Sequence, residues 1–584
     1  MIDLKARPFY LDDEAIFWVE TTLASMTLEE KCGQVFCPMG FNNDPENLNH
    51  LIREIKIGGM MYRPSFAADI QQTHRTIQEM AKIPLLLAAN TECGGNGLAF
   101  EGTTFGQPMA VAATGDVEDA YRMGKVACSE GAAMGLNWSF APIVDIDMDF
   151  HNPITNTRTF GSDVQRGIDC GSAYMKAADE CDVAVAIKHF PGDGVDERDQ
   201  HILTSINSLS CEKWDETYGN IYGTLIQRNA KTVMVGHIAQ PAYVKALNPD
   251  ATNEECLRPA SLSRELMTGL LREKLGFNGL ISTDSTPMVG FTVAMPRAKA
   301  IPTAIANGAD MILFNKSIDE DFAYLMAGIR DGILSEDRLN EAVTRILATK
   351  ASLGLHKSIR VPEPEAVSVV GCERHWAWAA EVADKAVTLV KDTQNLLPIS
   401  PEKFPRVYLN VIQKTIVSND PVAAAWKELF EKEGFEVTVR DRTTSIGFAD
   451  MLNPAGMTDA QKNLMHEMYR SVEEMKQDYD LYVYIVNMEN ASNNTTLRLN
   501  WNVAFGLGDD APWLAAEIPV MMISTAYPYH MFDAPMIPTF INAYSGAPDF
   551  CKAIMEKIMG RSEFKGISPV DPFCGKDYLR MTAE

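Results

Sequence analysis

The chain has 584 residues, which at roughly 100 to 200 residues per domain leaves room for about two to four domains with buried cores. Hydrophobic residues make up 46% and charged residues 22%, close to a globular average, so the composition excludes a disordered, collagen-like or coiled-coil protein. Acidic residues number 78 and basic residues 52, and the net charge is −26. Such a chain repels polyanions on average, and we expect no nucleic-acid partner.

The N-terminal residues 1–20 have no basic start followed by an apolar run, and the chain has no stretch of about 18 apolar residues. We therefore expect a cytoplasmic protein without a membrane partner. The eleven cysteines are scattered, with no CxxC pair and no Cys/His cluster at zinc spacing. This usage predicts reduced thiols and neither a metal site nor a disulfide framework.

The first regular element expected along the chain is a helix that begins near residue 28. Thr27 and Glu30 have the spacing of a capping box, in which each side chain accepts a hydrogen bond from the other residue's backbone N–H. Short apolar runs then alternate with helical stretches, and their composition is typical of strands buried on both faces of a parallel sheet. The runs occupy residues 58–63, 83–89, 139–147, 183–189, 232–237, 279–284 and 311–315.

Repeated βα units over about 330 residues predict either a doubly wound sheet or a (β/α)8 barrel. The glycines in residues 94–97 lack the spacing of a dinucleotide-binding or P-loop fingerprint, which favours the barrel. Nearly every predicted strand also ends in polar or ionisable residues, as barrel strands do at their reactive face. These strand-end residues are Asn90, Thr91, Glu92, Asp145, Asp147, Lys188, His189, His237, Asp284 and Asn315.

The pattern breaks at residues 356–372, where two prolines and alternating polar residues predict a linker between domains. A helical segment at 372–390 follows, and strand-like runs then alternate with further helical segments such as 423–435. We therefore predict an α/β protein with a TIM-type (β/α)8-like barrel at 1–355 and a smaller α/β sandwich domain at 373–584. The strand-like runs of this second domain are 406–412, 481–486 and 519–524.

The densest group of polar side chains is the segment KHFPGDGVDERDQH at residues 188–201. Within it, Asp199 lies two residues before His201, and a carboxylate at that spacing can orient an imidazole and hold its proton for acid/base catalysis. The alternative for this triplet taken alone is a charged surface loop. Metal binding is disfavoured because further close ligands are missing.

Two other residues are candidates for the same site. Asp284 ends an apolar strand, where a rigidly held carboxylate suits a nucleophile or a charge stabiliser. Its alternative role is the N-cap of the following segment. Arg158 lies in a loop after a strand, where a guanidinium can bind a hydroxyl, carboxylate or amide oxygen in a bidentate manner, or can pair with Asp163.

Five motifs in order resemble glycoside hydrolase family 3, and within it the β-N-acetylglucosaminidase branch, in which KHFPG is followed by a D-x-H triplet. The resemblance runs from about residue 25 to the C-terminus. The motifs are GLNWSFAPIVDID, NPITNTRTFGSD, KHFPGDGVDERDQH, PASLSRELMTGLLREKLGFNGLISTDSTPM and LVKDTQNLLPIS.

This resemblance implies a retaining mechanism with a covalent glycosyl-enzyme on Asp284. His201, oriented by Asp199, is then the general acid and base. The substrate is β-linked N-acetylglucosamine at the non-reducing end of oligosaccharides or cell-wall fragments, and no metal or cofactor is needed. A homodimer remains open. The residues implied in sugar binding are Glu92, Arg158, Lys188, His189 and His237.

The chain departs from the family pattern at three places. Asn90 stands where the family usually has a sugar-binding Asp, and the Arg that ends that motif is missing. Asp193 replaces a usual His, and Gln200 replaces a small hydroxyl residue between the two catalytic residues. Three alternatives therefore remain: a β-glucosidase or β-xylosidase of the same family, a β-N-acetylglucosaminide phosphorylase, and a non-catalytic sugar-binding protein.

Overall fold

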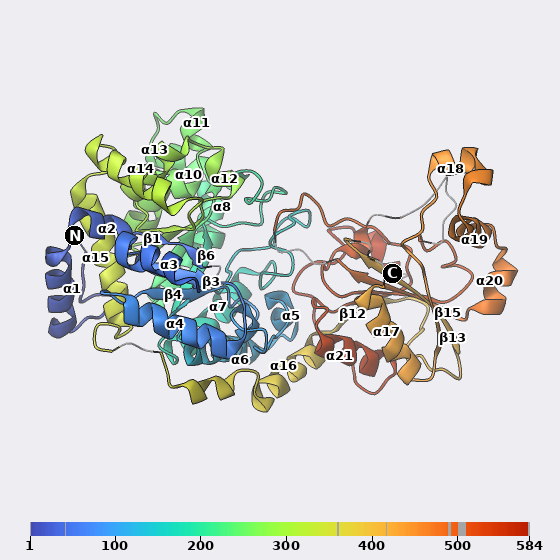
Figure 1. The fold of residues 1–584 in the computed structure, drawn as a ribbon. Coiled ribbons are helices and arrows are strands. Elements are labelled where there is room, and N and C mark those ends of the chain that lie inside the picture. The colour runs from blue at the N-terminus through green and yellow to red at the C-terminus, as the bar shows by residue number, and fades with distance from the viewer. Residues whose placement is uncertain are drawn as a thin grey trace. The chain divides into compact units, whose positions relative to one another are not determined.

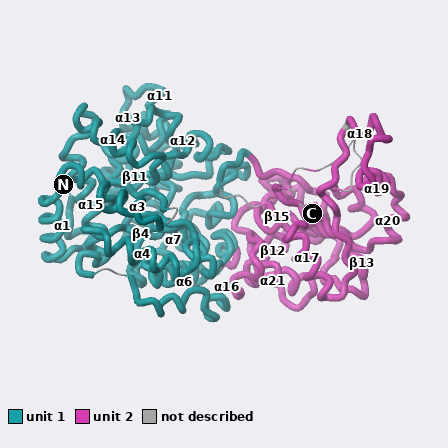
Figure 2. The backbone as a smooth tube through the Cα atoms, in the orientation of Figure 1, with its two compact units in different colours: residues 1–112, 116–379, 491–495 teal, residues 113–115, 380–490, 496–584 magenta. Residues whose placement is uncertain are grey.

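The computed structural model describes residues 2–40, 43–358, 361–415, 417, 419–488, 492–499, 501 and 510–581. Two compact units divide the chain (Figure 2): unit 1 has residues 1–112, 116–379 and 491–495, and unit 2 has 113–115, 380–490 and 496–584. The main boundary lies inside helix α16 (Glu373–Ala386), a few residues after the predicted start of the second domain at 373. Within the described ranges, no helix has the length and apolar composition needed to cross a bilayer.

Unit 1 is built on a sheet of parallel strands in the order β1-β11-β10-β8-β6-β5-β4-β3-β2 (Figure 1). The sheet returns to its start because residues 36–40 pair with both of its ends: β1 pairs with β11, and β2 pairs with β3. This closure confirms the predicted barrel. The strands are β1 (Phe36–Cys37), β2 (Met39–Gly40), β3 (Gly59–Tyr62), β4 (Leu86–Ala89), β5 (Trp138–Ser139), β6 (Ala184–Phe190), β8 (Thr232–Val235), β10 (Leu280–Ser285) and β11 (Met311–Leu313).

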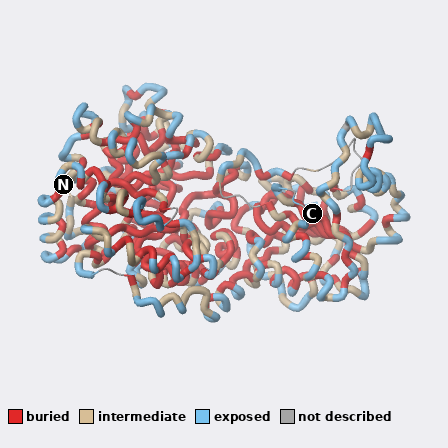
Figure 3. Tube along the Cα trace, viewed as in Figure 1, coloured by how far each residue is buried: buried red, intermediate tan, exposed pale blue. Residues whose placement is uncertain are grey.

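The barrel strands are almost entirely buried (Figure 3), because helices cover their outer face and side chains fill the inside. That is why their sequences are continuous apolar runs. The main helices of unit 1 are α1 (Asp13–Ser25), α2 (Leu28–Gln34), α3 (Pro45–Asn49), α4 (Ala67–Met80), α5 (Pro108–Ala113), α6 (Val117–Ala133), α7 (Val164–Asp179), α9 (Asn220–Gln227), α10 (Pro241–Leu247), α13 (Arg297–Asn307), α14 (Ile318–Arg330) and α15 (Glu336–Ser352).

Several local predictions can be compared directly with these elements. The capping box at the start of α2 is confirmed: Thr27 Oγ1 accepts from Glu30 N–H at 3.2 Å, and Glu30 Oε2 accepts from Thr27 N–H at 3.0 Å. The predicted strand at 139–147 is much shorter, since β5 ends at Ser139 and Pro142 has no N–H for a ladder. Strands β1 and β2 were not predicted, because Pro38 separates them into two-residue pieces.

Unit 2 is organised around a six-stranded sheet in the order β12-β17-β16-β15-β13-β14, in which only β12 runs antiparallel to its neighbour. The three predicted strand-like runs correspond to β13, β15 and β16. Because successive side chains point to opposite faces of a strand, these apolar runs place apolar side chains on both faces of the sheet. Both faces therefore have to be covered by other elements. The strands are β12 (Thr388–Asp392), β13 (Arg406–Gln413), β14 (Glu436–Val439), β15 (Leu481–Asn487), β16 (Val520–Ser524) and β17 (Thr539–Asn542).

Helices and loops provide that cover. Helix α17 contacts β13, β14 and α21, and the other face buries a cluster that includes Tyr408, Tyr482, Tyr484 and Phe540. Unit 2 is thus the α/β sandwich expected from the sequence. Its helices are α17 (Pro421–Lys432), α18 (Phe448–Leu452), α19 (Asp459–Met468), α20 (Val472–Asp478) and α21 (Pro548–Ile558).

Candidate active site

Unit 1 contains a polar cavity of about 400 Å³ at the carboxyl ends of the barrel strands. Parallel strands that close into a barrel bring all their carboxyl ends to one rim, so residues far apart in sequence meet there. Six of the eight predicted site residues line this cavity. They are Glu92, Arg158, Lys188, His189, His201 and Asp284.

Glu92 is the centre of a charged cluster on one wall of the cavity. Its Oε1 accepts from Lys188 Nζ at 2.7 Å and from Arg158 Nη2 at 2.9 Å, and its Oε2 accepts from Arg158 Nε at 3.1 Å. Arg158 thus forms the bidentate pair expected of a guanidinium, but with Glu92. The alternative partner, Asp163, instead caps helix α7 through Arg166 N–H at 2.7 Å.

Burial alone raises the pKa of a carboxyl group, but the charges of Arg158 and Lys188 hold the pKa of Glu92 well below its usual range. The wall therefore presents one carboxylate and two cations, all fixed in place before any ligand binds. Such groups hydrogen-bond sugar hydroxyls or an amide without first having to be ordered.

We expect Glu92→Ala to reduce both sugar binding and stability. Removing one partner of a buried ion pair typically costs about 3 to 5 kcal/mol, because the remaining charges lose their compensation. Glu92→Gln keeps the shape and one acceptor oxygen but loses the charge and turns an NH2 group toward a cation, so we expect a loss that is smaller than that of Glu92→Ala but not negligible. Denaturant midpoints measure stability, and KM for a nitrophenyl glycoside measures binding. Glu101→Gln, which removes a carboxylate at an exposed position of unit 1, is the control. Equal stability of Glu92→Ala and wild type would contradict the expectation.

Asp284 lies near the end of β10 and reaches into the cavity. Its Oδ1 accepts from Ser285 N–H at 2.6 Å, and its Oδ2 lies 3.9 Å from His189 Nε2. The short helix α12 (Val289–Thr292) has Met288 as its N-cap, so Asp284 does not cap it. Burial favours the protonated form, but His189, His237 and His201 more than offset it, and the pKa of Asp284 is lowered. This carboxyl group is therefore ionised and able to act as a nucleophile.

His189 is held in place by a carboxylate whose role the sequence did not reveal. Asp145 accepts from the His189 backbone N–H at 3.1 Å and pairs with its Nδ1 at 2.7 Å, which leaves Nε2 directed at Asp284. From the sequence, Asp145 was expected only as a polar strand end. Its partner could not be deduced, because the pairing joins residues 44 positions apart through the barrel rim.

Asp199 and His201 form the predicted dyad. Asp199 Oδ1 accepts from His201 N–H at 2.8 Å and contacts His201 Nδ1 at 2.7 Å. With Nδ1 engaged, Nε2 is the ring nitrogen available for proton transfer. The Asp199 side chain is fully buried, whereas the imidazole is 22% exposed and lines the cavity. The triplet is thus not a solvated surface loop, which was its alternative interpretation.

The second oxygen of Asp199 is held by a distant part of the chain. Its Oδ2 accepts from the backbone N–H of Asn493 at 2.6 Å and of Asn494 at 3.3 Å. These residues lie between β15 and β16 in sequence but belong to unit 1. Asn493 has φ of +62°, a left-handed conformation that Asn tolerates better than most residues. Both oxygens of the dyad carboxylate are therefore fixed.

The structure places His237 behind the cavity wall. His237 is fully buried, and its ring nitrogens contact Ser261 Oγ at 2.8 Å and the backbone oxygen of Ser285 at 2.9 Å. Both nitrogens are thus engaged by protein atoms, one of them belonging to the residue next to Asp284, and His237 is not among the described residues that line the cavity. Burial lowers the pKa of His237, and the nearby charge of Asp284 partly opposes this shift.

The glycine loop after β4 also contributes to the cavity, through Asn90, Cys93 and Asn96. A side chain at Gly95 would place its Cβ 1.8 Å from Glu130 Oε2, so only glycine fits there. Close packing against Glu130 thus requires a glycine at this point of the loop.

Further residues line the cavity beyond the predicted site residues. Asn90, which follows β4, was expected as a polar strand end, whereas Arg63, which follows β3, obeys the same strand-end rule but was not selected. Ser492 and Asn493 had no comparable signal in the sequence. Among the residues whose placement is described, no group of three or more His, Cys, Asp or Glu side chains is arranged to hold a metal ion.

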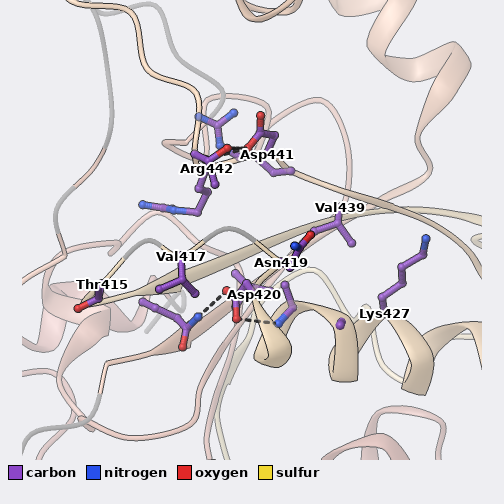
Figure 4. A pocket seen from close by; sticks show the side chains of 14 residues that line it. Thr415, Val417, Asn419, Asp420, Lys427, Val439, Asp441 and Arg442 are labelled. Carbon is purple, nitrogen blue, oxygen red and sulfur yellow. Dashed lines mark hydrogen bonds between the residues drawn. The ribbon is translucent and has the colours of Figure 1, made fainter. Parts of the chain in front are cut away.

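Unit 2 has a cavity of its own, of about 360 Å³, between the ends of β13 and β14 and the start of α17 (Figure 4). Lys427, Arg440 and Arg442 contribute positive charge. Arg440 and Arg442 both contact Asp510, at 3.5 and 2.6 Å, and Asp420 caps α17. The two arginines are thus paired with a buried carboxylate. No predicted site residue is among the described residues that line this cavity.

Comparisons with known proteins identify the family of this chain. Residues 27–349 match the family model described as glycosyl hydrolase family 3 N terminal domain. A protein of Cellulomonas fimi named beta-N-acetylglucosaminidase/beta-glucosidase is 42% identical over 581 residues, which cover 99% of each chain.

Two solved structures extend the likeness to the whole fold. Beta-glucoside phosphorylase BglX superposes with a TM-score of 0.90 at 42% identity, covering 99% of each chain. A glycoside hydrolase family 3 beta-N-acetylglucosaminidase from Paenibacillus sp. str. FPU-7 has a TM-score of 0.77 at 22% identity, over 94% of this chain and 99% of that one. At this lower identity the likeness concerns the fold.

Proposed function

Because this chain belongs to glycosyl hydrolase family 3, we propose that it removes β-linked N-acetylglucosamine from the non-reducing end of short glycosides by a retaining mechanism. The observation that carries the proposal is that Asp284, His201 and the Glu92 cluster line one cavity. The Cellulomonas fimi relative has both a β-N-acetylglucosaminidase and a β-glucosidase name, so β-glucosides are included as substrates.

In the first step, an Asp284 oxygen attacks the anomeric carbon and the bond to the leaving oxygen breaks. Protonated His201 gives its Nε2 proton to that oxygen, so the leaving group departs as a neutral alcohol. Asp199 Oδ1 accepts a hydrogen bond from His201 Nδ1–H and so stabilises the protonated imidazole until its Nε2 proton is transferred. The products are the alcohol, a covalent glycosyl-enzyme on Asp284 and neutral His201.

In the second step, neutral His201 takes a proton from the acceptor, whose oxygen attacks the anomeric carbon and releases Asp284. Two inversions at the anomeric carbon give net retention. The Glu92 cluster hydrogen-bonds the hydroxyl or amide groups of the same sugar. With water as acceptor, the overall reaction is hydrolysis.

A fluoro-sugar trap tests this mechanism. Incubation with a 2-fluoro or 5-fluoro glycosyl fluoride, followed by peptide mass analysis, should place the label on Asp284. A label on another carboxylate would reject the assignment, and binding without any turnover or label would favour a sugar-binding protein. Rates with nitrophenyl glycosides of N-acetylglucosamine, glucose and xylose identify the sugar, and a fastest rate with the xyloside would overturn our choice.

Phosphate as the acceptor in the second step is a second candidate. It is supported by the 42% identical structure named beta-glucoside phosphorylase. It is also supported by the acid/base group, because a neutral imidazole does not repel a phosphate dianion as a carboxylate does. Arg63 adds positive charge to the cavity wall. Comparing rates and products with and without phosphate distinguishes the two: phosphorolysis gives faster turnover and a sugar 1-phosphate that keeps the β configuration.

A further inference from the structure

Gln200, between the two dyad residues, is fully buried although it has a polar side chain. Its Oε1 accepts from the backbone N–H of His237 at 2.7 Å, and its Nε2 donates to Asp193 Oδ2 at 3.3 Å. Two of the three departures from the family pattern, Asp193 and Gln200, are therefore hydrogen-bonded to each other. A substitution at either position therefore changes the hydrogen bonding of the other residue.

The orientation of the Gln200 amide follows from its partners. A backbone N–H is always a donor, so the amide oxygen has to face His237 and the NH2 group has to face Asp193. Asp193 Oδ1 in turn accepts from Asn152 Nδ2 at 3.1 Å and from Gly194 N–H at 2.8 Å. In this connection, which runs from Asp193 through Gln200 to His237, each donor thus meets an acceptor.

Both ends of this connection are anchored near the candidate nucleophile. The Asp193 backbone N–H donates at 2.8 Å to Asp145 Oδ1, the carboxylate that also holds His189. At the other end, His237 Nε2 contacts the backbone oxygen of Ser285, next to Asp284. Burial and the nearby charge of Asp145 raise the pKa of Asp193 to about 7, whereas the hydrogen bonds donated by Gly194 and Asn152 favour its ionised form.

The loop has little freedom to move while this connection is intact. A Cβ at Gly236 would lie 2.9 Å from Gln200 Oε1, and a Cβ at Gly290 would lie 2.4 Å from the Gln200 backbone oxygen. The backbone oxygen of His201 accepts from Val289 N–H at 3.0 Å. Close packing of this kind fixes the loop in one position on the barrel rim.

We propose that Asp193 and Gln200 are a pair of positioning residues, which hold the loop of His201 against β8 and so set the approach of His201 to the sugar bound at Asp284. The proposal rests on the roles given to His201 and Asp284 under the proposed function. Neither Asp193 nor Gln200 is among the described residues that line the cavity, so the pair acts through His201.

A reciprocal exchange of donor and acceptor tests the pair. In Asp193→Asn, the two donors at Oδ1 force the amide oxygen to that side, so the new NH2 faces the Gln200 NH2. In Gln200→Glu, a second carboxylate oxygen faces Asp193. In the double variant D193N/Q200E, the new NH2 group at position 193 donates to the new carboxylate at position 200, which still accepts from His237. The total charge equals that of the wild type.

Values of kcat/KM for a phenyl and a 2,4-dinitrophenyl glycoside are compared at about pH 8, above the raised pKa of Asp193. We expect Asp193→Asn to lose about 10- to 100-fold with the phenyl glycoside, which needs a proton, and little with the dinitrophenyl glycoside, which does not. Adding Gln200→Glu should recover most of the loss. The exposed Glu197→Gln variant of the same loop is the charge-matched control and should behave as wild type.

Three results would overturn the proposal: an unimpaired Asp193→Asn variant, a double variant no better than Asp193→Asn, or equal losses with both substrates. Equal losses indicate a general structural defect, which a thermal midpoint also detects. Fluoro-sugar labelling of the wild type distinguishes failure of this proposal from failure of the proposed function. Label on a residue other than Asp284 refutes the proposed function itself. Label on Asp284, together with a double variant that recovers no activity, refutes only the positioning role of Asp193 and Gln200.

Discussion

Replacing Asp284 by alanine is expected to lower kcat by at least about 10⁴-fold, because it removes the atom that forms the covalent bond in the first step. The carboxylate is positioned by Ser285 N–H and lies opposite His189. The measurement is steady-state turnover of a dinitrophenyl glycoside, with a thermal midpoint to show that the variant is folded.

Added azide provides a specific control for that variant. The space left by the Asp284 side chain admits a small anion, which attacks the anomeric carbon once and gives a glycosyl azide of inverted configuration. Asp284→Ala without azide should be nearly inactive, and azide should restore part of the rate. A variant with more than about one-tenth of wild-type kcat would contradict the role of Asp284 as nucleophile.

The lowered pKa of Asp284 has a consequence for the pH profile of the wild type. An acid with a depressed pKa in the folded protein keeps its charge as the pH falls, and loses it only below the ordinary value of about 4. Asp284 therefore stays ionised through the weakly acidic range. A decline of kcat/KM above about pH 4 then reports a different group.

Replacing His201 by alanine is expected to lower kcat/KM by about 10²- to 10⁴-fold for a phenyl glycoside and far less for a dinitrophenyl glycoside. The reason is that only the poorer leaving group needs a proton as the bond breaks. The ratio of the two losses is the measurement, because damage to the fold lowers both alike. Equal losses would show that His201 is not the general acid.

Asp199→Asn is the matched variant for the dyad. Asp199 Oδ1 accepts from His201, and Oδ2 accepts from the N–H groups of Asn493 and Asn494. An asparagine in this place would turn its NH2 group either toward the backbone N–H of His201 or toward those of Asn493 and Asn494. In both orientations donor faces donor, and one of the two hydrogen-bonded sides is lost. We expect a loss with the same dependence on the leaving group as His201→Ala. An Asp199→Asn variant with wild-type kcat/KM would show that the carboxylate does not orient the imidazole.

Much of the barrel and most of its rim were predictable because the information is local. A strand buried on both faces is a continuous apolar run, and its polar end marks the rim, as at Lys188, His189 and Asp284. The strand-end rule also applied to Arg63, which was overlooked. It failed for His237, because a polar residue at a strand end can turn to protein partners instead of the cavity.

The contacts that decide the geometry of the site are not local and were not predicted. Asp145 holds His189 across the rim, and Asn493 reaches Asp199 from 294 positions along the chain. The Asn493 contact uses a backbone N–H, which every residue except proline has, so the side-chain sequence carries little record of it. The hydrogen bond between Asp193 and Gln200 was also unforeseen, although both residues had been singled out.

The position of Asn493 and Asn494 in the chain limits how the enzyme can be shortened. A fragment that stops after residue 379 includes every barrel strand, Asp284 and the complete loop of His201, but it lacks the two amides that hold Asp199 Oδ2. Its acid/base group would then have a carboxylate fixed at one oxygen only. We therefore expect an efficient catalyst made from this sequence to extend past residue 494, or to contain replacement donors for Asp199 Oδ2.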